Sequence, residues 1–482
     1  MKQSLFSSPA QSMSDFMDRR GFLRKGAAVS AGAGLFLATS KSAIAQGTAA
    51  DRPLKVGIVG CGAQGQRLLA ACKDIPGLQF VAACDIWNYN RNSVVGSFPR
   101  NAMPTPYEDI EEMLAKQKDI ECVLIATPDF MHAPHTRLAL QAGKSVYCEK
   151  MMSNTIEAAR DMVKAQRETG GILQIGHQRH SNPRYLHLRD NVLNKAKMLG
   201  RVTHCYGQWN RGVSASQPQN MPEKYLIPAD KLAKYGFNSG EEFRNWRFYS
   251  KYGAGPISDL GAHQIDMFNW FSGTTPVSVM AQGGVDYYDG QDGRVKYELP
   301  DNVMAMYEYK TAEGIMRAYY QVLTTSGSQG YFEKLMGING SVSISESPTY
   351  NQIYREPNAP SWEQYAEGSN PFVVRAADQV YNKFWEKPKP WTRPKSWMDV
   401  KKGAADARES KALENWILPV ILTRPPHAPH LENFFTAVRK KDPAMLTCNV
   451  EEAFRACVTV LKCYESMQTG AKYVFKPEDF TV

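Results

Sequence analysis

The sequence lacks most of the features that mark disulfide-bonded, membrane-spanning or nucleic-acid-binding proteins. Its nine cysteines are an odd number without paired spacing, so no disulfide framework is expected. Beyond residue 45, no uncharged apolar run approaches the roughly 20 residues that span a bilayer. Lysine and arginine form no basic run interleaved with aromatic residues, which argues against a nucleic-acid partner. Internal repeats and low-complexity segments are absent too.

The composition indicates a globular chain with more than one core. Its 482 residues are 43% hydrophobic and 22% charged, which suits a well-buried protein of two domains. The formal net charge is +9, but residues 1–45 hold six basic side chains against two acidic ones. The rest of the chain is therefore only mildly basic, and no acidic partner is indicated.

The N-terminal segment resembles a twin-arginine export signal. Arg19 and Arg20 precede a glycine- and alanine-rich apolar stretch over residues 26–40, and a small-x-small pattern ends at Ala45. A short helix or an uncleaved anchor is the alternative, but the stretch is about half as long as a bilayer-spanning helix. We therefore expect residues 1–45 to be a signal peptide, cleaved after Ala45, and the mature protein to be periplasmic.

Between residues 54 and 176, short β-branched runs alternate with helical stretches. The expected strands are 54–59, 78–84, 121–126, 145–148 and 172–176, and the expected helices are 66–73, 107–116, 135–142 and 156–169. This alternation is typical of a parallel sheet with crossover helices. We therefore expect an α/β Rossmann domain over residues 46–175.

After residue 176 the pattern changes to longer strands and fewer helices. Strands are expected at 202–209, 277–285, 302–309 and 316–323, and a helical pattern covers 430–467. This predicts a C-terminal α+β domain over residues 176–482, with a mostly antiparallel open sheet that binds the substrate. Residues 348–429 interrupt the pattern with Pro, Trp, Lys and Asn, and we interpret them as an insertion over the surface or toward a partner subunit.

A glycine-rich turn follows the first expected strand and opens a helix. It contains Gly60, Gly62, Ala63, Gln64 and Gly65. Glycine permits the tight turn, the approach of backbone to a pyrophosphate and close helix packing. Asp85 ends the second strand 20 residues after Gly65, where a carboxylate can bond ribose hydroxyls. A plain glycine turn is the alternative; the strand–turn–helix context favours a dinucleotide, and Asp85 favours NAD over NADP.

Later motifs resemble the glucose-fructose oxidoreductase and inositol dehydrogenase (Gfo/Idh/MocA) family. They are Ala126-Thr127-Pro128, His132, His135, the run 143–150 ending in Glu149-Lys150, the run 176–179, Asn182-Pro183 and the run 253–263. The resemblance covers about residues 54–309 and resumes near 430, leaving out the insertion. It implies an NAD(P)-dependent oxidoreductase acting on a carbinol carbon of a sugar, cyclitol or glycoside. A small sugar-like substrate and a homo-oligomer are expected.

The resemblance also implies a set of cofactor-binding residues. They are Gly60, Gly62, Ala63, Gln64, Gly65, Asp85, Thr127, Pro128, His132, Glu149 and Lys150. In the family the Glu-Lys pair ends a strand beside the nicotinamide, and the lysine contacts cofactor and substrate, so Lys150 is the expected catalytic lysine. The family usually has proline next, whereas this chain has Met151-Met152, which leaves the shape of that loop open. Without the resemblance, Lys150 would be a solvated residue after an edge strand.

Asp259 and His263 are four residues apart and so share one face of a helix. A histidine can take a hydroxyl proton, and a nearby carboxylate can orient it or bind a second hydroxyl. Spacing alone favours a helix N-cap and a core histidine, but the family's Asp-x-x-x-His implies catalytic roles. Arg179, Trp246 and Arg247 are candidate sugar contacts, since planar donors and aromatic faces suit polyhydroxylated ligands; packing explains Trp246 equally well.

No metal site is expected. Histidines with i, i+3 spacing are His132 and His135, His177 and His180, and His427 and His430. No cysteine or acidic cluster joins any pair along the sequence, and two pairs fall inside family motifs that bind no metal.

Two other functions fit the same residues. One is a redox-neutral NAD-dependent glycoside hydrolase, lyase or epimerase, in which transient oxidation of the ring acidifies a neighbouring C–H. The other is a non-catalytic sugar-binding protein, against which the retained Lys150, Asp259 and His263 argue.

Overall fold

The computed structural model describes residues 52–347, 349–376 and 413–482. The expected signal peptide in residues 1–45 lies outside the described residues, and so does the middle of the expected insertion. Among the helices of the described ranges, none combines the length and the apolar character needed to cross a bilayer.

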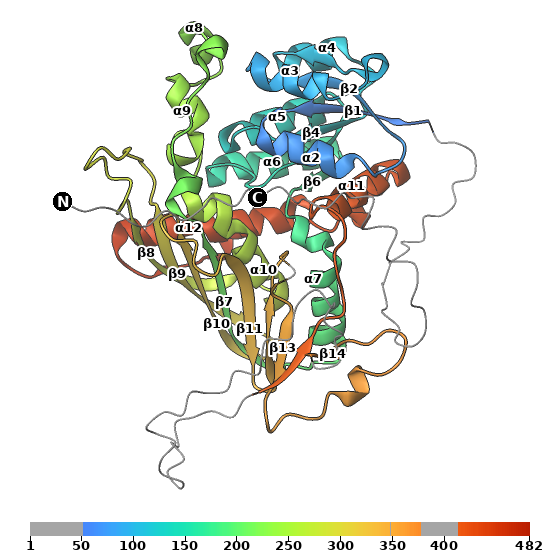
Figure 1. The fold of residues 1–482 in the computed structure, drawn as a ribbon, viewed down its shortest axis with the longest axis vertical. Coiled ribbons are helices and arrows are strands. Elements are labelled where there is room, and N and C mark those ends of the chain that lie inside the picture. Colours follow the sequence, from blue (N-terminus) through green and yellow to red (C-terminus); the bar gives the residue numbers. More distant parts are fainter. Residues whose placement is uncertain (1–51, 348, 377–412) are drawn as a thin grey trace, which may run out of the picture. The chain divides into compact units, whose positions relative to one another are not determined.

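The first half of the described chain is a six-stranded parallel sheet surrounded by its crossover helices (Figure 1). In spatial order the strands are β3 (Thr105–Tyr107), β2 (Leu78–Cys84), β1 (Leu54–Val59), β4 (Cys122–Ile125), β5 (Ser145–Cys148) and β6 (Leu173–Ile175). The helices are α2 (Ala63–Cys72), α3 (Asn88–Gly96), α4 (Ile110–Lys116), α5 (Asp129–Gln141) and α6 (Ile156–Thr169). The strand order reverses between β1 and β4, and ligands of such sheets bind outside the carboxyl ends of the strands at that point.

Local sequence explains the element boundaries, including those that the pattern placed wrongly. The expected helix 107–116 is shorter, because Tyr107 belongs to β3 and the side chain of Asp109 accepts a hydrogen bond from Glu111 N, 2.8 Å away, as the cap of α4. Helix α5 begins six residues earlier than expected, at Asp129. Helix α3 was not predicted, since only Val94 of its nine residues is buried and no apolar periodicity marks it.

The second half is built on a ten-stranded sheet. Its order is β14 (Val374–Arg375), β15 (Glu414–Ile417), β13 (Gln352–Arg355), β12 (Gly340–Ile344), β11 (Tyr331–Gly337), β7 (Val202–Asn210), β10 (Gly314–Leu323), β9 (Asn302–Thr311), β8 (Pro276–Gly284) and β16 (Tyr473–Val474). Only β7 and β10 pair in parallel, which confirms the expected α/β class with a mostly antiparallel second sheet. The described parts of the expected insertion add β13, β14 and β15 to this sheet instead of interrupting it.

The remaining helices lie against this sheet or link it to the first. They are α7 (Pro183–His187), α8 (Ala229–Lys234), α9 (Gly240–Arg244), α10 (Ala262–Ser272), α11 (Ala428–Lys440) and α12 (Val450–Thr469). A π-helical segment, Ile257–Gly261, leads directly into α10. The helical pattern expected over 430–467 is two helices, because Pro443 cannot continue α11 and the capping box of Asn449 starts α12.

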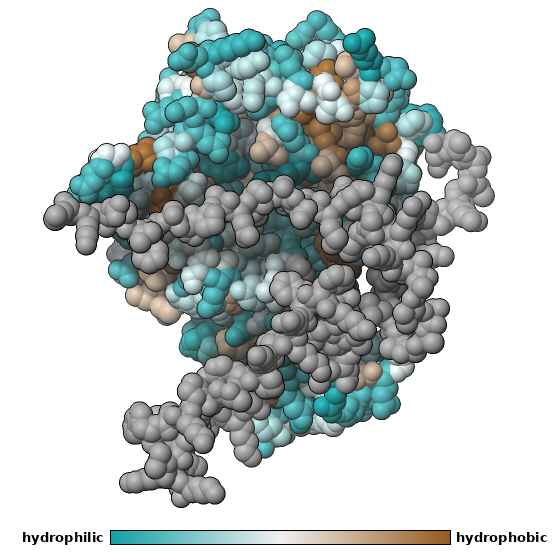
Figure 2. All heavy atoms as spheres, viewed as in Figure 1, coloured by the Kyte–Doolittle hydropathy of each residue, from teal (hydrophilic) through white to brown (hydrophobic). Residues whose placement is uncertain are grey.

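Helix α11 packs against the first half although about 370 residues separate it from β1. Leu431, Phe434 and Phe435 are buried residues of α11 and share a core with Leu68 of α2 and Val56 of β1. The chain's C-terminal part therefore helps to close the Rossmann core. Next to it, α2, β2 and α3 line a hollow with apolar side chains such as Leu69 and Phe80 and polar ones such as Gln66 and Lys73, and Figure 2 shows hydrophobic surface over this part of the first half.

Candidate active site

A cavity of about 920 Å³ lies at the carboxyl ends of β1, β2, β4 and β5, and elements of the second half complete its wall. It is lined by these predicted site residues: Gly60, Gly62, Ala63, Gln64, Asp85, Thr127, Pro128, His132, Glu149, Lys150, Trp246, Arg247, Asp259 and His263. Of the predicted residues, Gly65 and Arg179 are not on the wall. One cavity thus brings together residues that the sequence assigned to a cofactor and to catalysis.

The three glycines of the first turn have different roles. Gly60 has a φ of +91°, and a Cβ there would lie 2.5 Å from the backbone of Ala126. A Cβ on Gly65 would overlap the carbonyl oxygen of Gly60, so this glycine allows α2 to pack against the turn. A Cβ on Gly62 would meet only the Asn90 side chain, at 3.6 Å. The backbone at Gly62, where α2 begins, is therefore open to the cavity, as approach by a pyrophosphate requires.

Asp85 is held by backbone at the end of β2. Its Oδ2 accepts a hydrogen bond of 2.8 Å from Cys61 N, and its Oδ1 accepts one of 2.8 Å from Trp87 N. Burial raises the pKa of Asp85, and these two N–H donors oppose that shift. Arg91 donates to the backbone carbonyl of Asp85 over 2.6 Å and is not part of the cavity wall. The residues fit a dinucleotide whose ribose hydroxyls face this carboxylate.

His132 joins the loops that follow β4 and β5. Its ring nitrogens lie 2.5 Å from the carbonyl oxygen of Met151 and 2.7 Å from that of Thr127. Burial lowers the pKa of His132 to about 4, so the ring is neutral and can donate to only one of the two carbonyls. The loop after Lys150 thus has a defined anchor without the family's proline; the Lys150–Met151 peptide bond is cis, and Met151 is buried.

Lys150, at the end of β5, points at Asp259 in the π-helical segment of the second half. Its Nζ donates to the backbone carbonyl of Asp259 and lies 3.7 Å from Oδ1. Arg247 Nε is 3.2 Å from Oδ1, and Arg211 Nη1 is 3.8 Å from Oδ2. Burial alone would raise the pKa of Asp259, but these three cations hold it well below its usual value. Asp259 is therefore an ionised anchor and caps no helix.

His263 lies in the first turn of α10 and faces the cavity. It is 7% exposed, its Nδ1 has no hydrogen-bond partner among the described residues, and its ring tilts against Trp209 at 5.4 Å. Burial, together with the charges of Lys150 and Arg179, holds the pKa of His263 well below its usual value. A neutral, unpartnered imidazole at a cavity wall can accept a proton.

The structure adds cavity residues that sequence reasoning missed. Asp129 follows the Thr-Pro motif and is 5% exposed. Its burial raises the pKa of Asp129 to about 7. Trp209 is near the end of β7 and stacks on Tyr331 with ring centres 4.3 Å apart, and Arg211 directly follows the strand. Of these three residues, only Asp129 could have been predicted from the sequence, because it directly follows the Thr127-Pro128 motif.

Of the three predicted sugar contacts, Trp246 and Arg247 are on the cavity wall and Arg179 is not. The guanidinium of Arg247 lies 4.3 Å from the ring centre of Trp246. Arg179 is 1% exposed and forms ion pairs with Glu333 and, at 3.3 Å, with Glu346. The guanidinium of Arg179 therefore contacts two carboxylates and the ring of Trp209 inside the protein, and it is not exposed to a ligand in the cavity.

Replacement of Arg179 by methionine is expected to destabilise the protein by about 3–5 kcal/mol, because Glu333 would be left buried without its cation. Urea unfolding followed by tryptophan fluorescence measures this change. The matched control is Arg317→Met, whose partner Glu308 is a surface group and whose loss should cost at most about 1 kcal/mol. Equal losses for the two variants would contradict the structural role of Arg179.

A glycine turn for a dinucleotide, together with a lysine and a neutral histidine in one cavity, defines a dinucleotide-dependent oxidoreductase class. Family profiles agree: the oxidoreductase family with NAD-binding Rossmann fold matches residues 54–177, and the GFO/IDH/MocA C-terminal domain matches residues 232–341. The chain belongs to the Gfo/Idh/MocA family of oxidoreductases.

Three relatives illustrate the range of that family. A 1,5-anhydro-D-fructose reductase of Ensifer adhaerens is 26% identical over 50% of this chain and 62% of its own length. A glycosyl hydrolase family 109 protein of Stenotrophomonas maltophilia is 26% identical over 75% of this chain and 86% of its own. The crystal structure of a myo-inositol 2-dehydrogenase from Lactobacillus plantarum, at 18% identity, superimposes with a TM-score of 0.57 over 88% of this chain and 100% of its own, which supports the fold alone.

Proposed function

We propose that the protein is an NAD(P)-dependent oxidoreductase acting on a carbinol carbon of a sugar, cyclitol or glycoside. The observation that carries this proposal is the meeting of Lys150 and His263, from the two halves of the fold, in the cavity that begins at the glycine turn. A nicotinamide bound there supplies hydride acceptance and donation. The protein's residues then have to position the substrate and move its hydroxyl proton.

The charges of the site assign these tasks. His263 is neutral and accepts the proton of the substrate hydroxyl. Lys150, fixed by the ionised Asp259, donates a hydrogen bond to the same oxygen and stabilises negative charge as it develops there. The rings of Trp209 and Trp246 offer apolar faces to a sugar, and Arg247 offers planar donors. Asp259 itself stays charged and does not carry the proton.

A redox-neutral glycoside reaction is the second candidate. The alignment with the glycosyl hydrolase family 109 protein covers 75% of this chain, which favours it as the alternative. Incubation of the purified protein with a panel of sugars, cyclitols and glycosides, with products identified by mass spectrometry, separates the two. A product changed by two hydrogens supports the oxidoreductase, whereas hydrolysis or isomerisation without a change in cofactor redox state supports the alternative. Lack of turnover across the panel would favour a sugar-binding protein.

The cofactor is expected to be NAD rather than NADP. The carboxylate of Asp85 repels a 2′-phosphate, and Arg91 is occupied by a backbone carbonyl outside the cavity wall. Titration of cofactor-free protein with NADH and NADPH, followed by nicotinamide fluorescence, should give the lower dissociation constant for NADH. Tighter binding of NADPH would contradict this assignment. In an Asp85→Ser variant, the dissociation constants for NADH and NADPH should be closer to each other than in the unmodified protein.

The proposal also includes export of the protein to the periplasm and its assembly into a homo-oligomer. The twin-arginine motif at Arg19 and Arg20 supports transport of the folded enzyme to the periplasm. Met280, Met304 and Met306 are exposed on one face of β8 and β9, which supports self-association through this sheet face. Light scattering of the mature protein should accordingly give a mass that is a multiple of the single chain.

A further inference from the structure

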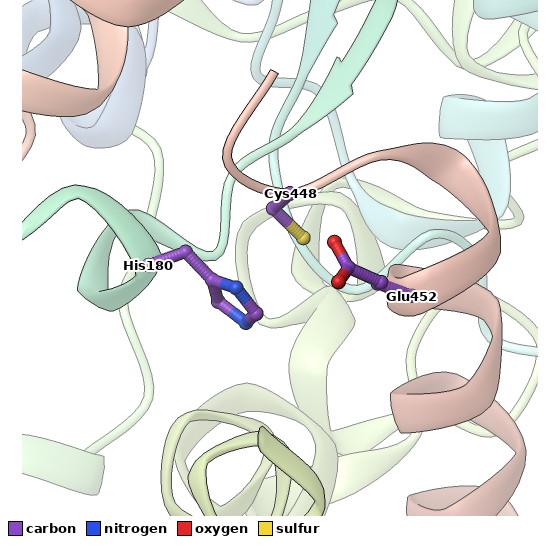
Figure 3. A group of neighbouring side chains, drawn as sticks. All are labelled: His180, Cys448 and Glu452. Atoms are coloured by element: carbon purple, nitrogen blue, oxygen red, sulfur yellow. The ribbon is translucent and has the colours of Figure 1, made fainter. Parts of the chain in front are cut away.

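Outside the cavity, three side chains of metal-binding type lie together (Figure 3). His180 belongs to a short helical turn after β6, Gln178–Ser181, while Cys448 precedes α12 and Glu452 lies in its first turn. One ligand atom from each lies within 4.8 Å of the other two. His180 and Cys448 are buried, Glu452 is half-buried, and none of the three lines the cavity.

The ring of His180 is oriented as a metal ligand would be. Its Nε2 lies 3.0 and 3.2 Å from the two carboxylate oxygens of Asp266, which is itself buried. Among the described residues its Nδ1 has no hydrogen-bond partner of ordinary geometry, although the residue is only 1% exposed; the backbone of Thr447 is near enough to the ring to raise its pKa. Metal-bound histidines commonly donate their second ring N–H to a carboxylate, which fixes the ring and leaves the other nitrogen for the metal. Figure 3 shows one ring nitrogen turned toward Cys448 and Glu452.

The cluster is also held from the backbone. Glu452 is fixed by the capping box of α12, in which Asn449 N donates to Glu452 Oε2 over 3.3 Å and the Asn449 side chain accepts from Glu452 N. The carbonyl of Cys448 accepts from Ile175 N, at 3.5 Å, at the end of β6. The ligands therefore come from two separate elements that already pack against each other, so little chain entropy has to be lost on binding a cation.

We propose that His180, Cys448 and Glu452 bind one divalent transition-metal ion of the zinc type. Imidazole, thiolate and carboxylate together suit zinc, whereas magnesium and calcium prefer oxygen ligands alone. Three protein ligands leave a fourth tetrahedral position for a water molecule or a backbone oxygen. Bonds of about 2.0–2.3 Å require the side chains to draw together slightly. The ion would tie the turn after β6 to the start of α12, and it would not take part in the cavity's chemistry.

Proton release accompanies this binding. The thiolate of Cys448 and the unprotonated Nδ1 of His180 are the forms that bind a metal ion, whereas a thiol and an imidazolium are not. The ion displaces the thiol proton and the imidazole Nδ1 proton to solvent and forms bonds to sulfur and nitrogen in their place. Affinity therefore increases with pH.

The competing arrangement is a protonated His180 between Asp266 and Glu452 with no metal. The full-length protein, stripped with a chelator and refilled with Zn²⁺ or Co²⁺, distinguishes the two. We expect one bound ion per chain by mass spectrometry of the metal, a higher melting temperature with Zn²⁺, and thiolate-to-cobalt charge-transfer absorption with Co²⁺. Cys448→Ser should abolish that absorption, and Asp266→Asn should weaken binding about 10–100-fold. Cys457→Ser, a buried thiol elsewhere on α12, is the matched control and should keep both signals.

Two results would overturn the proposal. One is failure of the unmodified protein to bind either ion at one per chain at neutral or mildly alkaline pH. The other is charge-transfer absorption that Cys448→Ser leaves unchanged, because the cobalt would then be bound by a different thiol. The unmodified protein gives an answer even if a variant fails to fold.

Discussion

Turnover is expected to fall on the order of 10²–10⁴-fold when Lys150 is replaced by alanine, and by a similar factor in a separate His263→Ala variant. Both side chains act at the reacting carbon, whereas the dinucleotide phosphates are held by the turn at Gly60 and Gly62. The variants should therefore still fold and bind dinucleotide. Steady-state kinetics on the substrate found by the panel, with NADH titration in parallel, measures both properties.

Matched controls for these variants lie on the protein surface. Lys251→Ala and His204→Ala remove exposed side chains of the same type outside the cavity and should keep near-normal turnover. Because the pKa of His263 lies far below its usual value, protonation of this ring should not limit turnover near neutral pH. Near-normal turnover in both Lys150→Ala and His263→Ala would refute the active-site assignment.

The mature protein is expected to carry its dinucleotide out of the cytoplasm and to keep it through many turnovers. The periplasm is expected to hold no usable nicotinamide pool, so a cofactor lost after each cycle could not be replaced. A folded Rossmann domain can carry its ligand through the twin-arginine route. At a free dinucleotide level of about 1 nM, half occupancy needs about −12 kcal/mol of binding free energy.

Such tight binding favours a closed cycle, in which one substrate or step reduces the cofactor and another reoxidises it. The test isolates the protein from the periplasm, assays nucleotide in an acid extract and follows turnover in cofactor-free buffer. We expect close to one nucleotide per active site and many turnovers without added NAD. If the isolated protein contained no nucleotide and turned over only with added NAD, the closed cycle would be contradicted, and the enzyme would be a dehydrogenase that exchanges its cofactor. The same protein expressed without residues 1–45 and kept in the cytoplasm is the control for loading.

Much of the first half could be predicted because its signals are local. Gly60, Gly62 and Gly65 lie within six consecutive residues, and strand β1 and helix α2 on either side of them were predicted from periodicity. Helix α3 was missed because only Val94 of that helix is buried, and a single buried residue gives no apolar periodicity from which a helix could be predicted. The second sheet was predicted to be mostly antiparallel, but only β7, β8, β9 and β10 were predicted as strands. The pattern missed β11 and β12, and it missed β13 to β16, which have two to four residues each; of these, β13 to β15 lie in a proline-rich stretch.

The sequence by itself determined the nucleotide-binding half and the antiparallel character of the second sheet. It also predicted Lys150, Asp259 and His263 as a set, and the structure places all three on one cavity wall. Only the tertiary structure decided that Asp259 is an ionised anchor, since its pKa depends on three cations from three separate segments. The tertiary structure also showed that Arg179 pairs with Glu333 inside the protein and does not line the cavity, and that Cys448 lies close to His180. Spacing along a chain reports contacts within one helix or strand, whereas charge, burial and ligand geometry depend on residues that meet only after the sheets have packed.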